Sequence, residues 1–302
     1  MSTIDLSVEI AGVKWKNPVT VASGTFGSGM EFADLMDLNV LGAVTTKGVA
    51  SKPWKGNDTI RVVETASGML NSIGLQNPGI DTFIDRDIPF LEKYDTVKIV
   101  NVVGKTIEEY VDVIKALNSQ PVDMYEINIS CPNVKEGGIA FGQDPRAAAD
   151  VTKAVKEASE KPVIMKLSPN VTSITEMAKA VEEAGADALS LINTLAGMKI
   201  DINRRVFTLA NKTGGLSGPA IKPVALRMVY EAAHAVDIPV IGMGGIASAE
   251  DAVEFIMAGA TAVSVGTANF NNPQVTVEIV DGIREYLEKN GVGSVKELVG
   301  II

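Results

Sequence analysis

The chain contains one cysteine, Cys131, and one histidine, His234, among its 302 residues. A single thiol cannot form an internal disulfide, and it cannot hold an iron–sulfur cluster, which takes about four thiolates. Any iron–sulfur chemistry must therefore belong to another chain. His234 lies in a helical pattern far from the predicted strand ends, so we expect it at the surface or in helix packing. Ser-His-Asp and Cys-His mechanisms and histidine-based metal sites are disfavoured, and we predict no metal site.

Positive charge is also in deficit, since 27 Lys and Arg face 37 Asp and Glu for a net charge of −10. No basic stripe with interleaved aromatics occurs, so we expect no nucleic-acid partner. No apolar run reaches the roughly 18 residues needed to cross a bilayer. The first residues lack the basic and apolar segments of a secretory signal. We therefore expect a cytoplasmic protein with no membrane partner.

What the chain does have is an alternation of short apolar runs with amphipathic stretches. Continuous apolar runs are typical of parallel strands that helices cover on both faces. Eight runs are predicted as strands, at residues 19–22, 43–47, 97–102, 124–128, 163–167, 188–192, 240–243 and 262–265. Helices are predicted at residues 106–118, 145–159, 173–184, 222–235 and 249–258. Caps support several of them, such as Asp144 before Pro145 and Ser248 with Asp251 three residues on.

Eight strands in βα alternation predict an α/β fold of the (β/α)8 TIM-barrel type. A doubly wound sheet is the alternative, but it normally has fewer strands and a Gly-x-Gly-x-x-Gly turn. The glycines at residues 24–29 have a different spacing. Two long segments interrupt this alternation: residues 51–95, which contain a strand-like piece at 59–64, and residues 195–221. We expect a single domain over residues 1–302, whose long loops form a rim at the carboxyl ends of the strands.

Polar residues and glycines follow the predicted strands one after another, and in a barrel such positions converge on one mouth. The residues at these strand ends are Ser23, Lys47, Asn101, Asn128, Cys131, Lys166, Asn193, Thr194, Gly244, Gly245, Gly266 and Thr267. The glycines after the seventh and eighth strands suit a phosphate cradle, in which backbone N–H groups approach an anion. The alternative is that they form only tight turns.

Two lysines at inner strand ends are costly to bury without an anion. Lys166 would suit the N1–C2=O edge of a flavin, where positive charge stabilises the reduced ring. Lys47 would suit a substrate carboxylate. One of the two could instead be a Schiff-base lysine of an aldolase-like barrel, or both could be structural. The first of these alternatives leaves Cys131 without a function.

Four asparagines lie on loops that reach the predicted mouth: Asn71, Asn128, Asn133 and Asn193. An amide is both donor and acceptor, which suits a planar ligand with alternating N–H and C=O groups. Their alternative use is in turn formation. Cys131 follows the fourth strand between Asn128 and Asn133, in more polar surroundings than a buried small hydrophobe needs.

Together these residues resemble the dihydroorotate dehydrogenases, over essentially the whole chain. The motifs that carry the resemblance are NPVTVASGTFG at 17–27, TKG at 46–48, NSIGLQNPG at 71–79, NISCPN at 128–133, GLSGP at 215–219 and GMGGI at 242–246. The resemblance implies a (β/α)8 barrel that carries one FMN. It further implies oxidation of (S)-dihydroorotate to orotate in de novo pyrimidine (UMP) biosynthesis, with Cys131 as general base at C5 and hydride transfer from C6 to FMN N5.

The resemblance also assigns residues to the two ligands. The FMN contacts that it implies are Ser23, Lys47, Gly48, Asn101, Asn128, Lys166, Ile192, Gly218, Gly244, Gly245, Gly266 and Thr267. The substrate contacts that it implies are Lys47, Asn71, Ser72, Ile73, Gly74, Leu75, Asn128, Asn133, Asn193 and Thr194.

The membrane-associated members of the family have a serine as base. Cys131 in its place resembles class 1, and the ASGTFG segment at 22–27 resembles the NAD-linked subtype B of that class. That subtype implies a partner subunit carrying FAD and a [2Fe–2S] cluster, and a catalytic homodimer core within a heterotetramer. A fumarate-reducing class 1A homodimer remains an alternative. So do a non-redox phosphate-binding TIM barrel and a binding module without turnover.

Overall fold

The computed structural model describes residues 4–129 and 141–302. Eight of its strands form one parallel sheet, in the spatial order β3-β16-β15-β10-β9-β8-β7-β4. Their bounds are β3 Val19–Val21, β4 Ala43–Thr45, β7 Val97–Val102, β8 Met124–Asn128, β9 Val163–Lys166, β10 Ala188–Leu191, β15 Val240–Met243 and β16 Ala262–Val265. The amide of Gly42 donates to the Val19 carbonyl at 3.0 Å, which joins β4 to β3 and closes the barrel. The predicted (β/α)8 barrel is confirmed.

Helices cover the barrel where the sequence predicts them, within two residues at each end. They are α4 Ile107–Leu117, α5 Pro145–Ala158, α6 Ile174–Glu183, α7 Lys222–Ala233 and α8 Ala249–Met257. The Asp144 side chain accepts from the Ala147 amide at 2.9 Å, and Ser248 with Asp251 forms a capping box, as their spacing predicts. None of the helices in the described part of the chain is both long and apolar enough to cross a membrane.

The alternation is less regular than predicted at the start of the barrel. Only the four-residue α1, Ser23–Phe26, follows β3, and the C-terminal helix α10, Val275–Asn290, packs against that strand instead. After β4 the chain returns through α2 Ile80–Thr82, a π-helical turn at Phe83–Asp87, and α3 Ile88–Leu91. Neither of the first two strands is therefore followed directly by a long helix.

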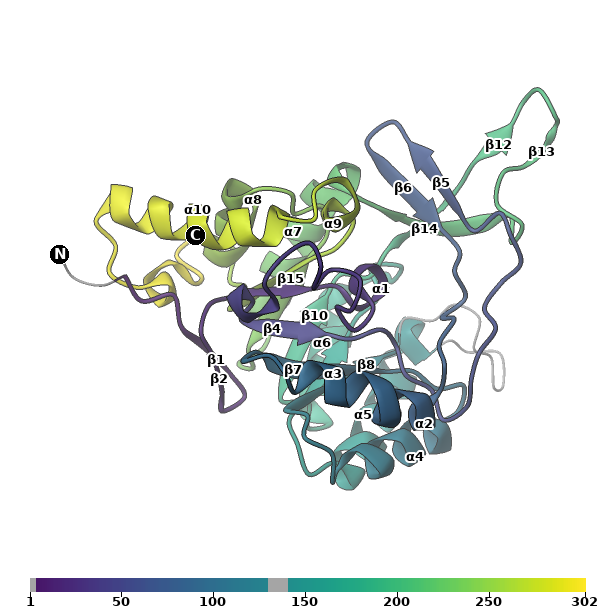
Figure 1. The fold of residues 1–302 in the computed structure, drawn as a ribbon, viewed down its shortest axis with the longest axis horizontal. Coiled ribbons are helices and arrows are strands. Elements are labelled where there is room, and N and C mark those ends of the chain that lie inside the picture. Colours follow the sequence, from purple (N-terminus) through teal and green to yellow (C-terminus); the bar gives the residue numbers. More distant parts are fainter. Residues whose placement is uncertain (1–3, 130–140) are drawn as a thin grey trace.

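The two long segments meet in a second, antiparallel sheet with the order β11-β14-β6-β5. The first contributes β5 Val62–Thr65 and β6 Gly68–Asn71, and the second contributes β11 Leu195–Met198 and β14 Thr213–Ser217. The predicted strand at 59–64 is therefore displaced toward its carboxyl end. Figure 1 shows this sheet at one end of the molecule, with the β12–β13 hairpin (Ile200–Asp201 and Val206–Phe207) projecting beyond it.

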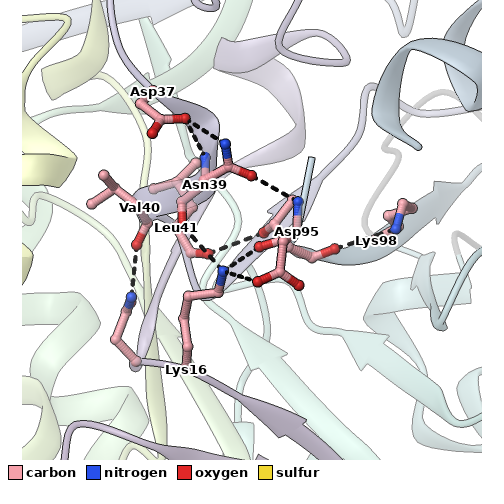
Figure 2. A network of polar contacts seen from close by, with 9 residues as sticks. Lys16, Asp37, Asn39, Val40, Leu41, Asp95 and Lys98 are labelled. Carbon is pink, nitrogen blue, oxygen red and sulfur yellow. Dashed lines mark hydrogen bonds and ion pairs between the residues drawn. The ribbon is translucent and has the colours of Figure 1, made fainter. Parts of the chain in front are cut away.

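A small hairpin, β1 Val8–Ile10 and β2 Val13–Trp15, lies away from that sheet in Figure 1 and packs on the core through Ile10 and Trp15. Lys16, directly after it, bonds the Asn39 carbonyl at 3.2 Å and the Asp95 carboxylate at 2.9 Å. The Asp95 amide donates to the Asn39 side chain at 2.7 Å (Figure 2). These residues precede β3, β4 and β7, so the network links the amino ends of three strands. Because Asp95 is largely exposed, the network aligns these segments more than it stabilises them.

Candidate active site at the carboxyl end of the barrel

A cavity of about 670 Å³ lies where the carboxyl ends of the barrel strands meet the second sheet. Its volume is in the range of small-molecule and cofactor sites, roughly 300–1,000 Å³. Both long segments contribute to its wall, through Val62 and Met69 from the first and Thr213 and Ser217 from the second. The predicted rim is confirmed, and it is a sheet rather than a set of independent loops.

The cavity gathers all the described residues that the sequence predicts for the two ligands. Those predicted for FMN that line it are Ser23, Lys47, Gly48, Asn101, Asn128, Lys166, Ile192, Gly218, Gly244, Gly245, Gly266 and Thr267. Those predicted for the substrate are Lys47, Asn71, Ser72, Ile73, Gly74, Leu75, Asn128, Asn193 and Thr194. Their ligands remain predictions, but the structure brings them to one place.

Two predicted site residues, Cys131 and Asn133, lie outside the described residues. The chain on both sides of them reaches the cavity. Ile129 lines it before them in the sequence, and Gly142 and Gln143 line it after them. Cys131 is thus two positions from a cavity-lining residue.

His234 lies outside the cavity wall, as predicted. It is exposed at the carboxyl end of α7, and its Nδ1 lies 2.8 Å from the Tyr230 carbonyl oxygen. Its ring also stacks at a tilt on the Tyr230 ring, with 4.1 Å between centroids. The histidine therefore has a local role in ending the helix.

Neighbouring strands form a buried polar cluster at the floor of the cavity, and its members Ser23, Asn101 and Lys166 line the cavity. Lys166 ends β9, and its Nζ lies 3.4 Å from Glu126 Oε1 on β8 and 3.4 Å from Ser23 Oγ. Glu126 also accepts from Asn101 Nδ2 at 2.6 Å and from Ser190 Oγ at 2.8 Å. Because strand side chains alternate between the two faces, these residues point into the barrel while their neighbours point toward the helices.

Sequence reasoning missed Glu126 and Ser190 as parts of the site. A signal for Glu126 was present, because a carboxylate inside a parallel strand is rare unless it is paired. Only 2% of the residue is exposed, and Lys166 is 4% exposed. An isolated charge at that depth would cost several kcal/mol, so the pair and its hydrogen bonds are what make the burial tolerable.

The wall offers what a flavin ring requires. Among the described residues, Asn101 Oδ1 is buried without a hydrogen-bond partner, although its Nδ2 donates to Glu126. Ser264 Oγ, on β16, is likewise buried without a partner and lines the cavity. An orphaned amide oxygen and hydroxyl are groups that a planar ligand with N–H and C=O edges would satisfy. The residues present fit FMN.

The glycines of the cavity wall fit a phosphate. Gly218 and Gly245 have φ angles of 95° and 77°, which favour glycine. A Cβ at Gly245 would lie 2.9 Å from the Gly218 carbonyl oxygen, so side chains would also fill the space between the two loops. Two glycine loops that close on each other and present backbone N–H groups are typical of an anion cradle.

Lys47 faces the same cavity from the segment after β4. Burial lowers the pKa of its ammonium below the usual value, and the positive charges of Lys166 and Arg61 lower it further. Its backbone amide donates to the Gly27 carbonyl at 2.8 Å, which fixes the residue at the strand end. Such a lysine is a good partner for a ligand carboxylate, because an anion offsets both the desolvation of the ammonium and its repulsion by the neighbouring cations.

The predicted substrate residues are supported by two asparagines that sequence reasoning did not single out. Asn57 Nδ2 donates to the Ser72 carbonyl and hydroxyl oxygens, at 3.1 and 3.0 Å. Asn170 Nδ2 donates to the Thr194 carbonyl at 3.0 Å, and its Oδ1 accepts from the Ala196 amide at 2.9 Å. Both line the cavity. They lie on loops that only the folded chain brings together, so spacing alone gives no sign of them.

Comparisons with known proteins agree with this geometry. The sequence model of the family described as dihydroorotate dehydrogenase matches residues 5–287. A protein of Lachnoclostridium phytofermentans named dihydroorotate dehydrogenase B (NAD(+)), catalytic subunit, is 62% identical over 299 residues, which cover 99% of this chain and all of that protein. Proteins of the same name from Alkaliphilus metalliredigens and Geotalea uraniireducens are each 59% identical, over 300 and 303 residues. These alignments cover 99% and 100% of this chain, and 99% of each relative.

Three findings lead to one assignment. The family model matches most of the chain, these full-length relatives are up to 62% identical to it, and the barrel has its cavity at the carboxyl ends of the strands. The chain belongs to the dihydroorotate dehydrogenase family.

Proposed function

We propose that the chain is the catalytic subunit of an NAD-linked dihydroorotate dehydrogenase and oxidises (S)-dihydroorotate to orotate in de novo pyrimidine biosynthesis. The observation that carries the proposal is one cavity that brings together two lysines, a glycine cradle and the asparagine-bearing loops. Residues 1–302 would act as one FMN-binding domain in the cytoplasm. The names of the full-length relatives support both the substrate and the acceptor.

FMN, when bound, would supply the hydride acceptor for this reaction. Gly218, Gly244 and Gly245, with Gly266 and Thr267, would hold its phosphate. Lys166 and Asn101 would face its ring from the floor of the cavity. These assignments rest on the fit of an orphaned acceptor and a glycine cradle to the two ends of that molecule.

The chain's own residues would bind and orient the substrate. Lys47 would neutralise its carboxylate, and Asn71, Asn128 and Asn193 would match its alternating N–H and C=O groups. Cys131, as thiolate, would take the proton from C5 while the hydride leaves C6. The double bond then forms between C5 and C6, and the thiol must lose its proton to solvent before the next turnover. Closing the substrate between the second sheet and the barrel would exclude water from the reacting carbons.

The electrons would leave through another chain. The sequence supplies one cysteine, too few for a cluster, so a [2Fe–2S] cluster, together with FAD, would reside on an electron-transfer subunit. A homodimer of this chain flanked by two such subunits, a heterotetramer, is the assembly we propose.

An acceptor test separates this proposal from its rivals. The purified chain should contain FMN and should reduce artificial acceptors with dihydroorotate. It should not reduce fumarate, and it should reduce NAD only after the partner is added. Rapid fumarate reduction by the chain alone would indicate the class 1A enzyme. A colourless protein would contradict the flavin assignment and favour a non-redox barrel.

A further inference from the structure

Glu126 is a buried carboxylate to which the proposed reaction gives no direct part. It lies on β8, inside the barrel, next to the lysine that we assign to the flavin ring. It is 2% exposed, and three side chains, from Asn101, Lys166 and Ser190, point their donors at it. A carboxylate placed only to fill space would be a poor choice at this position, because an apolar residue of similar size packs there without desolvation cost.

The geometry points to Glu126 as the counter-ion that keeps Lys166 charged beneath the flavin, and so as a positioning residue that sets the proton stoichiometry of flavin reduction. The inference rests on the proposed function, because it places FMN over Lys166. Glu126 itself does not line the cavity wall, whereas Lys166 does. It would therefore act on the cofactor only through the lysine.

The hydrogen bonds make an ionised Glu126 the form that fits. Asn101 Nδ2 can only donate, at 2.6 Å, and Lys166 Nζ donates to the same oxygen at 3.4 Å. Ser190 Oγ donates to the other oxygen at 2.8 Å. A carboxylate accepts all three bonds. The bond to Glu126 also holds Asn101 with its Oδ1 unbonded by any residue of 4–129 or 141–302, so the same cluster that pairs the lysine also orients an acceptor for the ring.

The charges around Lys166 show why a counter-ion is needed. The charged side chains that the structure places against it are Glu126 from β8 and Lys47 from the segment after β4, with Arg61 beyond Lys47. Repulsion between the two lysines already contributes to lowering the pKa of Lys47. Without Glu126, Lys166 would be a buried ammonium with a cation nearby and no carboxylate paired with it in the part of the chain that the structure describes. Such a group gives up its proton when the flavin is oxidised and neutral.

Reduction would then restore that proton, because it creates a negative ring beside the amine. In the wild-type chain, Lys166 is charged in both states, so two electrons enter the flavin with one proton. In the E126Q variant, two electrons enter with two protons, one on the flavin and one on Lys166. The slope of the midpoint potential against pH should therefore double.

The substitution is well suited to the test because glutamine keeps the shape of the side chain. Its carbonyl would accept from Asn101, and its amide would donate to the Ser190 hydroxyl, which can also accept. The matched control is S190A, which removes one bond to the same carboxylate but no charge. An unperturbed thiol has a pKa of about 8.5, within the pH range of the experiment, so all variants carry C131A to remove the thiol proton from the measurement.

The experiment is a dye-mediated reductive titration of the FMN-loaded chain from pH 6 to 9 (about three units), with no dihydroorotate present. We expect a doubled slope for E126Q, the wild-type slope for S190A, and a return to the wild-type slope in E126Q/K166M. A wild-type slope in E126Q would overturn the proposal, because Lys166 would then hold its charge unaided.

A folding defect would also be informative. If E126Q loses FMN or aggregates while E126Q/K166M folds and binds FMN, the unpaired lysine is the cause, and Glu126 acts through Lys166 as proposed. If both variants fail, Glu126 is needed for the fold whatever Lys166 does, and the proposal is wrong. Failure of the proposed function gives a different result. If dihydroorotate does not reduce the FMN bound to the wild-type chain, the proposed reaction is wrong, but the slopes of midpoint potential against pH still test the pairing of Glu126 with Lys166.

Discussion

Asn71 of β6 pairs with Gly215 of β14, although 144 positions separate them in the chain. Through this pairing, two insertions from different strands become one wall of the cavity. The Asn71 side chain, predicted to bind substrate, also reaches the Gly215 carbonyl at 3.4 Å. A Cβ at Gly215 would lie 2.0 Å from Thr194 Oγ1, so the sheet can approach Thr194 only with glycine at this position.

Substitution of Gly215 by alanine should therefore damage substrate binding more than cofactor binding. The new methyl group must push Thr194 or the β6–β14 pair outward, away from the substrate. We expect KM for dihydroorotate to rise roughly tenfold, which corresponds to about 1.4 kcal/mol, with FMN content unchanged. G293A is the control, since its Cβ meets only the end of the Glu297 side chain. Equal KM values for the two variants would show that the close approach has no role.

Replacing Cys131 by alanine should abolish turnover by dihydroorotate and leave FMN bound. Because an unperturbed thiol has a pKa of about 8.5, wild-type activity should rise with pH up to that region. Steady-state rates across the pH range, together with the absorbance of bound flavin, measure both effects. Near-normal activity in C131A would remove this residue from the role of base.

Lys47 should make orotate binding sensitive to alkaline pH. Its folded pKa lies below the usual lysine value, so the free site loses its positive charge as pH rises, before an exposed lysine would. The affinity should be greatest below that pKa and should fall as pH rises through it, because a neutral amine no longer neutralises the carboxylate. Titrations of FMN absorbance with orotate at increasing pH measure the dissociation constant. Constant affinity up to about pH 10.4, the range of an ordinary lysine, would contradict the assignment.

Asn57 should help to position the predicted substrate-binding residues 71–75, although it need not contact the substrate itself. It donates two hydrogen bonds to Ser72, each worth about 0.5–1.5 kcal/mol net, so N57A should raise KM several-fold with a smaller change in kcat. N118A is the matched control, because Asn118 also bonds a backbone carbonyl, that of Ala158, but outside the cavity wall. If N118A raised KM as much as N57A, the effect would be one of general stability.

The sequence was sufficient to predict the barrel because its strands and helices carry local patterns. The eight apolar runs, and caps such as Asp144 and Ser248, are each visible within a few residues. The residues at the strand ends could be predicted to line one cavity because the carboxyl ends of the parallel strands of a barrel converge. Pairing of β6 with β14 was not predictable in the same way, since neither segment signals a partner so distant in the chain.

Glu126 shows a different limit. In the sequence it occupies a position in an apolar strand, and its partners Asn101, Lys166 and Ser190 come from three other strands. Only the register of the sheet, which sets Asn101 opposite Glu126 and Lys166 opposite Ser190, brings them together. A buried charge in a sequence therefore indicates that a partner exists, and the fold identifies it.

The most direct test of the central claim is the anaerobic visible spectrum of the purified chain before and after dihydroorotate is added. We predict a flavin band that bleaches, with one orotate formed for each FMN reduced and with no partner subunit present. A flavin band that dihydroorotate leaves unchanged, in protein that binds orotate, would contradict the account.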